Sequence, residues 1–162
     1  MRKVDLPEDI EGKLLLHSMP GCYETWDDFI DQAKEHGVKQ IFCLTHFEEI
    51  KEKSPDYAAA ITNEKVPFEK VDLPIEDFGT PNDKARFVAS VISASISLEA
   101  GHTIIIHCAE GIGRTGTFAS CVLQLLGQRQ DEAVAHVERA GSGAETNAQR
   151  QLISKFAESI TT

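Results

Sequence analysis

The sequence predicts one α/β domain, residues 1–162, with a central, mainly parallel sheet of about four to five strands flanked by helices on both faces. Short apolar or β-branched segments alternate with longer segments of helical periodicity, an alternation typical of parallel sheets with crossover helices. The chain has 162 residues, of which 41% are hydrophobic, enough to bury one substantial core. We find no internal repeat, low-complexity tract or linker in the sequence that would separate domains. These three observations favour a single domain.

Four short segments have the composition of β-strands, because each is rich in apolar or β-branched residues and only a few residues long. They are Lys13–His17, Val38–Leu44, Val66–Val71 and His102–His107. The segments between them show helical spacing, so we expect these strands to run parallel in one sheet.

The helices are predicted from apolar spacing and from start and stop signals. The segment Thr25–His36 opens with Thr25 and Asp28 as a capping box and stops before Gly37. The long proline-containing segment Asp72–Pro81 is expected to be an ordered loop, and long loops of this kind are often functional. The other predicted helices are two short pieces within Phe47–Asn63 broken at Ser54-Pro55, then Asn82–Ala100, Thr115–Leu126, Asp131–Ala140 and Glu145–Ile160.

Charge and cysteine content narrow the classes of function. The formal net charge of −10 disfavours nucleic acid and anionic membrane as partners, because both bind a basic surface. The longest apolar runs are far shorter than the roughly 20 residues that span a bilayer, and the start of the chain lacks the apolar region of a secretory signal. The four cysteines form no C-x-x-C pair, so neither a disulfide framework nor a zinc site is indicated. We expect a cytoplasmic protein with reduced thiols.

The segment His107–Thr117, HCAEGIGRTGT, follows a predicted strand and admits three phosphate-binding interpretations. Its G-x-G-x-x-G spacing matches a dinucleotide fingerprint, but the 46 residues after Gly116 contain no second strand ending in an acid. A nucleotide P-loop requires Lys-Ser/Thr where Thr117-Phe118 stands. The third interpretation, Cys-x5-Arg, uses Cys108 and Arg114 as well as the glycines.

In the Cys-x5-Arg interpretation, the loop bends so that Arg114 lies close to Cys108. Glycines 111 and 113 are expected to adopt positive φ and to turn backbone N–H groups inward as an anion nest. The helix that follows adds free N–H groups, and Arg114 supplies a planar fork for two oxygens of a tetrahedral dianion. A thiol in this field is expected to be ionised at neutral pH and to attack phosphorus. Neither a metal ion nor a cofactor is required.

These residues resemble a known family. The segment His107–Gly116 is similar to the H-C-x5-R-[ST]-G signature of the protein tyrosine phosphatase superfamily, in the compact form shared by dual-specificity enzymes and small bacterial tyrosine phosphatases. The segment Leu73–Pro81 resembles the general-acid loop of small members, and Glu145–Gln149 resembles the glutamine-bearing segment that places water. The resemblance implies a dual-specificity phosphatase-like fold.

The resemblance also implies a role for each matching residue. Cys108 would be the nucleophile, Arg114 the phosphate clamp, and Thr115 a hydrogen-bond donor to the departing sulfur. His107 would support the loop and Gln149 would orient water. The backbone of the remaining loop residues would bind phosphate; these are Ala109, Glu110, Gly111, Ile112 and Gly113.

The general acid is expected on a mobile loop upstream of the nucleophile. Asp77, 31 residues before Cys108, is our choice, and Asp72 and Glu76 remain alternatives.

The function predicted from the sequence is metal-independent hydrolysis of phosphotyrosine through a cysteinyl-phosphate, with phosphoserine and phosphothreonine left open as substrates. The expected partner is therefore a phosphorylated protein or peptide; the oligomeric state is left open, and a monomer is plausible. Glu110 in the loop disfavours a polyanionic inositol phospholipid. The alternatives are a phosphatase of a non-protein phosphomonoester, a non-catalytic phosphoprotein-binding module and a thiol redox enzyme. Cys121, beside Val122 and Leu125, is expected to be a core residue rather than a redox partner.

Overall fold

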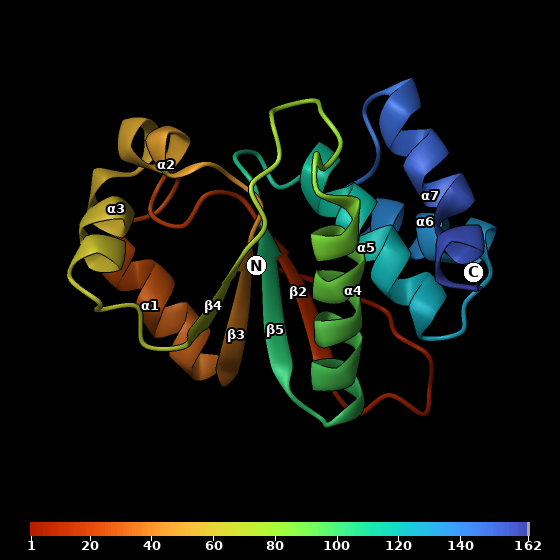
Figure 1. Ribbon diagram of the computed structural model, residues 1–162. Coiled ribbons are helices and arrows are strands. Elements are labelled where there is room, and N and C mark those ends of the chain that lie inside the picture. Colours follow the sequence, from red (N-terminus) through yellow and green to blue (C-terminus); the bar gives the residue numbers. More distant parts are fainter. Residues whose placement is uncertain (162) are drawn as a thin grey trace.

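The computed structural model describes residues 1–161, in which a five-stranded sheet lies between two layers of helices (Figure 1). The strands lie in the order β1-β2-β5-β3-β4, and β1 is antiparallel to β2 while the other pairs are parallel. The predicted fold class is confirmed. The strands are β1 Arg2–Val4, β2 Lys13–His17, β3 Val38–Cys43, β4 Glu69–Asp72 and β5 Thr103–His107.

Helices connect the strands close to the predicted positions. Thr25 caps α1 through its hydroxyl, which accepts a hydrogen bond from Asp28 N at 3.1 Å. The break expected at Ser54-Pro55 separates α2 from α3, because proline begins the second helix. The helices are α1 Trp26–Glu35, α2 Phe47–Lys53, α3 Pro55–Thr62, α4 Lys84–Glu99, α5 Gly113–Leu125, α6 Gln130–Arg139 and α7 Asn147–Thr161.

The central strand β5 has both faces buried, as expected for a parallel strand between two helical layers. Ile105 faces the side covered by α1, where it packs in one cluster with Phe29. Ile104 and Ile106 face the other side, which is covered by the longer helices. Three phenylalanines from α4, α5 and α7 meet there in edge-to-face contacts; they are Phe87, Phe118 and Phe156.

Helix α5 is the most enclosed helix among those described, since Gly113–Leu123 is buried without interruption. It packs against α4, α6 and α7 and follows directly on the loop after β5. Its N-terminus is therefore held in a fixed position at the carboxyl edge of the sheet.

Among the strands, β1 and β4 differ most from the prediction. Strand β1 was not predicted, and it is held by pairing Arg2–Val4 with Leu14–Leu16 of β2. Strand β4 begins at Glu69 instead of Val66, because only Glu69–Asp72 pairs with β3.

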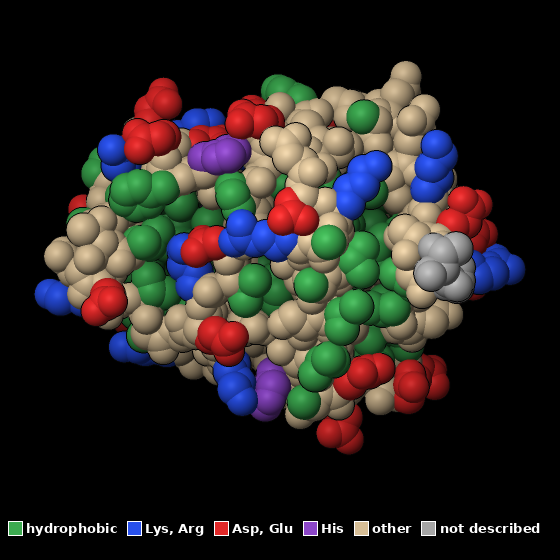
Figure 2. All heavy atoms as spheres, in the orientation of Figure 1, with side chains coloured by type: hydrophobic (Ala, Val, Ile, Leu, Met, Phe, Trp, Pro, Cys, Tyr) green, Lys and Arg blue, Asp and Glu red, His purple; other side chains and the backbone are tan. Residues whose placement is uncertain are grey.

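The surface is mixed in character. Figure 2 shows hydrophobic side chains on the face that carries α4, with acidic side chains along its upper and lower edges. Ile92 and Ile96 of α4 are among the exposed apolar residues. Across residues 1–161, no helix combines the length and apolar character needed to cross a membrane.

Candidate active site

The parallel sheet brings separate segments to one edge. Strands β3, β4 and β5 all end at this edge, so the segments that follow them lie close together. The loop 108–112 follows β5, α2 begins shortly after β3, and the loop 73–83 follows β4. The predicted nucleophile and general acid, Cys108 and Asp77, therefore come from adjacent segments although 31 residues separate them in the chain.

Backbone carbonyls of the loop point outward, where donors from neighbouring segments hold them. In a trans peptide the C=O and the next N–H point in opposite directions, so the corresponding N–H groups are directed to the inner side of the loop. This is the geometry of an anion nest. The bonds run from Leu44 N to His107 O (3.0 Å), from Met19 N to Ala109 O (2.8 Å) and from Gly143 N to Ile112 O (3.1 Å).

The two loop glycines have different roles. Gly111 has φ +74°, a conformation in which a Cβ is strained. The expectation of positive φ at Gly113 is wrong, because Gly113 is the first residue of α5, which starts two residues earlier than predicted. A Cβ at this position would lie 2.2 Å from Glu145 Oε1, so the Glu145 side chain would have to move aside. The N-cap residue Ile112 provides no side-chain cap, so the first N–H groups of α5 are available to an anion.

Arg114 is almost completely buried and is oriented by Glu49, a residue of α2. Nη1 and Nη2 of Arg114 each donate to one carboxylate oxygen of Glu49 at 2.9 Å, and Nη1 also donates to Ile75 O at 2.9 Å. Burial alone would lower the pKa of Arg114, but hydrogen bonding to Glu49 and the charge of Cys108 raise it overall. The hydrogen bond from Arg114 likewise lowers the pKa of Glu49, which stays ionised.

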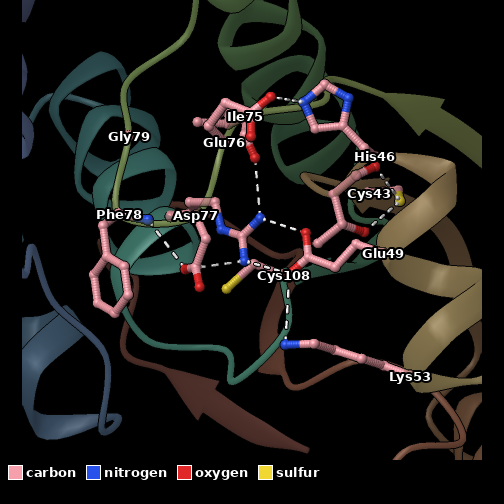
Figure 3. Close-up of polar contacts among 12 residues, drawn as sticks. Cys43, His46, Glu49, Lys53, Ile75, Glu76, Asp77, Phe78, Gly79 and Cys108 are labelled. Carbon is pink, nitrogen blue, oxygen red and sulfur yellow. Dashed lines mark hydrogen bonds and ion pairs between the residues drawn. The ribbon is translucent and has the colours of Figure 1, made fainter.

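Asp77 contacts the same guanidinium from the opposite side. Its Oδ1 accepts hydrogen bonds from Arg114 Nη2 at 3.3 Å and from Phe78 N at 3.0 Å. In Figure 3, dashed lines join the carboxylates of Asp77 and Glu49 to this guanidinium from two sides. Phe78 has φ +59° and a largely exposed ring. The loop therefore brings a carboxylate to the mouth of the nest.

The two alternative acids point elsewhere. The carboxylate of Asp72 pairs with Lys70, and that of Glu76 lies 3.0 Å from His46 Nε2. Of the three candidate carboxylates, Asp77 is the one that contacts Arg114.

Beneath the loop, His107 forms a buried hydrogen-bonded link between Tyr57 and the backbone of Cys108. Its Nδ1 lies 3.0 Å from Cys108 O, and its Nε2 lies 3.0 Å from Tyr57 Oη. A carbonyl accepts only, so Nδ1 carries the hydrogen, and in a neutral ring Nε2 accepts from Tyr57. Burial would raise the pKa of neighbouring Cys43, but His107 and Thr45 lower it to about 7.

Thr115 lies fully buried in the first turn of α5. Within the described part of the chain its Oγ1 has no hydrogen-bond partner. A buried hydroxyl without a partner is costly, so an available acceptor would be favoured there. This hydroxyl therefore has a hydrogen available in the first turn of the helix that follows the loop of Cys108.

Gln149 is also fully buried and links α7 to the loop that carries Asp77. Its Oε1 accepts from Glu145 N at 2.7 Å, and its Nε2 donates to Gly79 O at 3.1 Å. The structure therefore brings Gln149 to the loop 73–83, where one of its amide hydrogens binds Gly79 O.

Sequence reasoning missed Glu49. It is one of several acids in α2, and helical spacing alone does not distinguish it from Glu48. The available signal was its position just after the carboxyl end of β3, the edge where Cys108 lies. Within residues 1–161 we find no group of three or more His, Cys, Asp or Glu side chains arranged for a metal ion, and Cys121 is buried in the core.

Comparison with solved structures shows the class of fold. The chain superposes on kinase associated phosphatase, in a form whose catalytic-site cysteine is replaced by serine, with a TM-score of 0.85 and 20% identity over 99% of this chain and 95% of that one. It superposes on human tyrosine phosphatase-like serine/threonine/tyrosine-interacting protein with a TM-score of 0.73 and 18% identity, over 96% and 97% of the two chains. The expected dual-specificity phosphatase-like fold is confirmed.

Sequence comparison shows the family. Residues 11–161 match PTP-SAK, described as the Swiss Army Knife protein, DSP-PTPase phosphatase domain, and the chain belongs to this family. Protein tyrosine phosphatase type IVA 3 of Mus musculus is 26% identical over 138 residues, 82% of this chain and 72% of the relative. Protein 067L of Invertebrate iridescent virus 3, named as a tyrosine phosphatase, is 27% identical over 108 residues. That match covers 65% of this chain but only 41% of the viral protein. The chain is a phosphatase of the protein tyrosine and dual-specificity class.

Proposed function

We propose that this phosphatase hydrolyses phosphotyrosine in proteins or peptides through a cysteinyl-phosphate intermediate, without a metal ion, and that phosphoserine and phosphothreonine are poorer substrates. The observation that carries the proposal is that Cys108 opens the loop whose N–H groups are directed inward and that its charge acts on the guanidinium of Arg114. That arrangement fits a tetrahedral oxyanion next to a nucleophile.

Binding of the phosphate requires Arg114 to exchange one partner. Its two Nη groups donate to Glu49, Ile75 and Asp77, which uses all four of their hydrogens and leaves only Nε–H. When a phosphate oxygen replaces Asp77 at Nη2, Nε and Nη2 together form the bidentate fork. Glu49 stays bound on the other edge and keeps the fork oriented.

In the first chemical step, the thiolate of Cys108 attacks phosphorus and the bond to the ester oxygen breaks. Asp77, released from Arg114, takes up a proton from solvent and gives it to the leaving oxygen. In the second step, a water positioned with the help of Gln149 attacks phosphorus, and Asp77 accepts a proton from this water. The sulfur then leaves as a thiolate, and Thr115 Oγ1 donates a hydrogen bond to it.

The rim of the site favours an aromatic ester. Apolar side chains are exposed on segments that adjoin the loop, and an aryl group can bury them on binding. The carboxylate of Glu110, which accepts a hydrogen bond from the Tyr23 hydroxyl, repels substrates with further phosphates. The exposed apolar residues are Tyr23, Phe47, Phe78 and Ile112.

The test is hydrolysis of p-nitrophenyl phosphate with EDTA present, followed by matched peptides carrying phosphotyrosine, phosphoserine or phosphothreonine. We expect turnover that EDTA does not abolish, with the highest kcat/KM for the phosphotyrosyl peptide. Phosphopeptide binding without nitrophenol release would favour a binding module. Turnover of soluble phosphomonoesters but not of any phosphopeptide would favour a non-protein substrate.

A further inference from the structure

Arg2 of strand β1 reaches the back of the phosphate-binding loop. Its Nη2 donates a hydrogen bond to Gly111 O at 2.7 Å, across 109 positions of the sequence. Its Nη1 donates to Ala140 O at 2.8 Å and to Ser142 Oγ at 3.0 Å, both in the connection between α6 and α7. One guanidinium therefore joins the N-terminal strand, the loop and this connection.

The bond to Gly111 acts on the orientation of a peptide plane. Ser142 Oγ donates to the same carbonyl at 2.5 Å, so Gly111 O has two donors on the outer side of the loop. Because the peptide is planar and trans, fixing this oxygen outward fixes the N–H of Ile112 inward. The residue at position 111 has positive φ and is glycine, so its backbone has more freedom than that of any neighbour. An external restraint is therefore most effective at this peptide.

Arg2 also contributes charge. The guanidinium is half-buried, and burial lowers the pKa of Arg2 while the charge of Cys108 acts in the opposite direction. Arg2 thus adds positive potential from behind the loop, on the side opposite the open mouth where Asp77 lies. A fixed cation in a partly dry site stabilises anionic species more than one in water.

The position of Arg2 is set by its strand. It pairs with Leu16 of β2, and the neighbouring Lys3 is exposed. Arg2 lies outside residues 11–161, the segment that matches the family. This contact therefore involves a residue outside the matched segment.

We propose that Arg2 is a positioning residue for catalysis, which holds the Gly111–Ile112 peptide with its N–H toward the bound phosphoryl group and raises the affinity of the loop for oxyanions. This inference rests on the proposed function and assigns a catalytic contribution to the N-terminal strand.

The experiment uses the full chain with three changes, Arg2→Met, Arg2→Lys and Ser142→Ala. The matched control is Lys3→Met, which removes one positive charge from the same strand at an exposed position. For each we measure kcat and KM for p-nitrophenyl phosphate, the inhibition constant of vanadate, and the ratio of alkylation rates of Cys108 by iodoacetate and iodoacetamide. The ratio reports the anion field at the sulfur and does not depend on turnover.

Outright loss of an oxyanion donor costs about 10²–10³-fold in kcat, and a misoriented donor should cost less. We expect Arg2→Met to lower kcat/KM about tenfold and to raise the inhibition constant of vanadate by a similar factor. It should also lower the ratio of the alkylation rates with iodoacetate and iodoacetamide. Arg2→Lys keeps the positive charge but not the planar guanidinium. It should therefore leave the alkylation ratio close to that of the wild type while still lowering kcat/KM. Ser142→Ala should lower kcat/KM less than Arg2→Met does. The double variant should lower kcat/KM by less than the product of the two single factors, because both side chains bind the same carbonyl.

The proposal is overturned if Arg2→Met folds and leaves both kcat/KM and vanadate inhibition equal to those of Lys3→Met. A lower melting temperature with unchanged vanadate inhibition would also overturn it, because that result indicates a role in stability alone. If Arg2→Met does not fold, Arg2→Lys and Ser142→Ala decide by the same criteria. If the wild-type protein fails to hydrolyse phosphomonoesters, the proposed function is wrong, whereas the alkylation ratio still tests the effect of Arg2 on the loop.

Discussion

Asp77 and Arg114 are in direct contact, with Nη2 of the arginine 3.3 Å from Oδ1 of the aspartate. The candidate general acid thus occupies a position that a phosphate oxygen would take on the candidate clamp. Substrate binding and release of Asp77 are coupled in this arrangement, because a phosphate oxygen and the Asp77 carboxylate compete for the same hydrogen of the guanidinium.

Cys108→Ser should abolish turnover of p-nitrophenyl phosphate and leave vanadate binding largely intact. The alcohol replaces the nucleophile, while the N–H nest and Arg114 stay in place. Isothermal titration with vanadate, alongside a turnover assay, measures both. Activity retained in this variant would remove the nucleophile assignment.

Arg114→Lys should lower kcat/KM by about 10²–10³-fold. The planar guanidinium can bind Glu49 with one edge and two phosphate oxygens with another, whereas an ammonium group has no such edges. Steady-state kinetics gives the ratio. Arg129→Lys is the control, since the pairs that Arg129 forms with Asp131 and Glu132 are exposed. Equal kinetics for the two variants would refute the clamp.

Asp77→Asn should reduce kcat for phenyl phosphate by about 10²–10⁴-fold and much less for an ester whose leaving group needs no proton. A series of aryl phosphates with different leaving-group pKa values gives the comparison. Asp72→Asn serves as the control, because Asp72 pairs with Lys70 away from Arg114. If the Asp72 variant shows this pattern, the wrong carboxylate was chosen.

Glu49→Gln should lower both kcat/KM and stability at pH 7. Hydrogen bonds to a charged group contribute about 1.5–3 kcal/mol, and Glu49 is mostly buried. Arg114 lowers the pKa of Glu49 in the folded protein. The contribution of ionised Glu49 to stability is therefore fully present above the unfolded-state pKa of about 4.3 and is lost as pH falls through the lower folded-state pKa.

Melting temperatures measured from pH 7 down to pH 3 should therefore show wild type and Glu49→Gln converging at the acid end. Glu48→Gln is the matched control, since Glu48 is exposed and pairs with Lys51. A constant difference across this range would argue against an ionised Glu49 in the fold.

Tyr57→Phe should destabilise the protein by about 1–3 kcal/mol, because it leaves buried His107 Nε2 without its donor. Chemical denaturation measures the change, and Tyr23→Phe controls for loss of an exposed hydroxyl. We also expect a modest fall in kcat, since His107 holds the carbonyl of Cys108. No loss of stability would show that another donor replaces Tyr57.

The sequence predicted much of the sheet, because β2, β3 and β5 are apolar runs with clear boundaries. It did not predict β1, since three residues with two positive charges carry no periodicity and pair only because Leu14–Leu16 offers an edge. The apolar pattern of the sequence also did not predict where β4 begins, because that boundary depends on pairing with β3.

For the site, the sequence placed Cys108, Arg114 and Asp77 by spacing and by resemblance to a family, and their roles stay predictions. Glu49 and Arg2 were missed because their partners lie far away in the chain, and for Glu49 the available signal was its position after β3. Gly113 was assigned the wrong conformation, because a glycine in the sequence does not reveal its φ, and in the structure Gly113 is the first residue of α5.

Phe78 is a bulky residue with a left-handed backbone, adjacent to Asp77. Such a conformation costs on the order of 1–3 kcal/mol compared with an ordinary one. The contacts of Asp77 with Arg114 and with Phe78 N are made in this conformation, so they offset part of its cost. Replacement of Phe78 by glycine would remove that cost, because glycine adopts positive φ without strain.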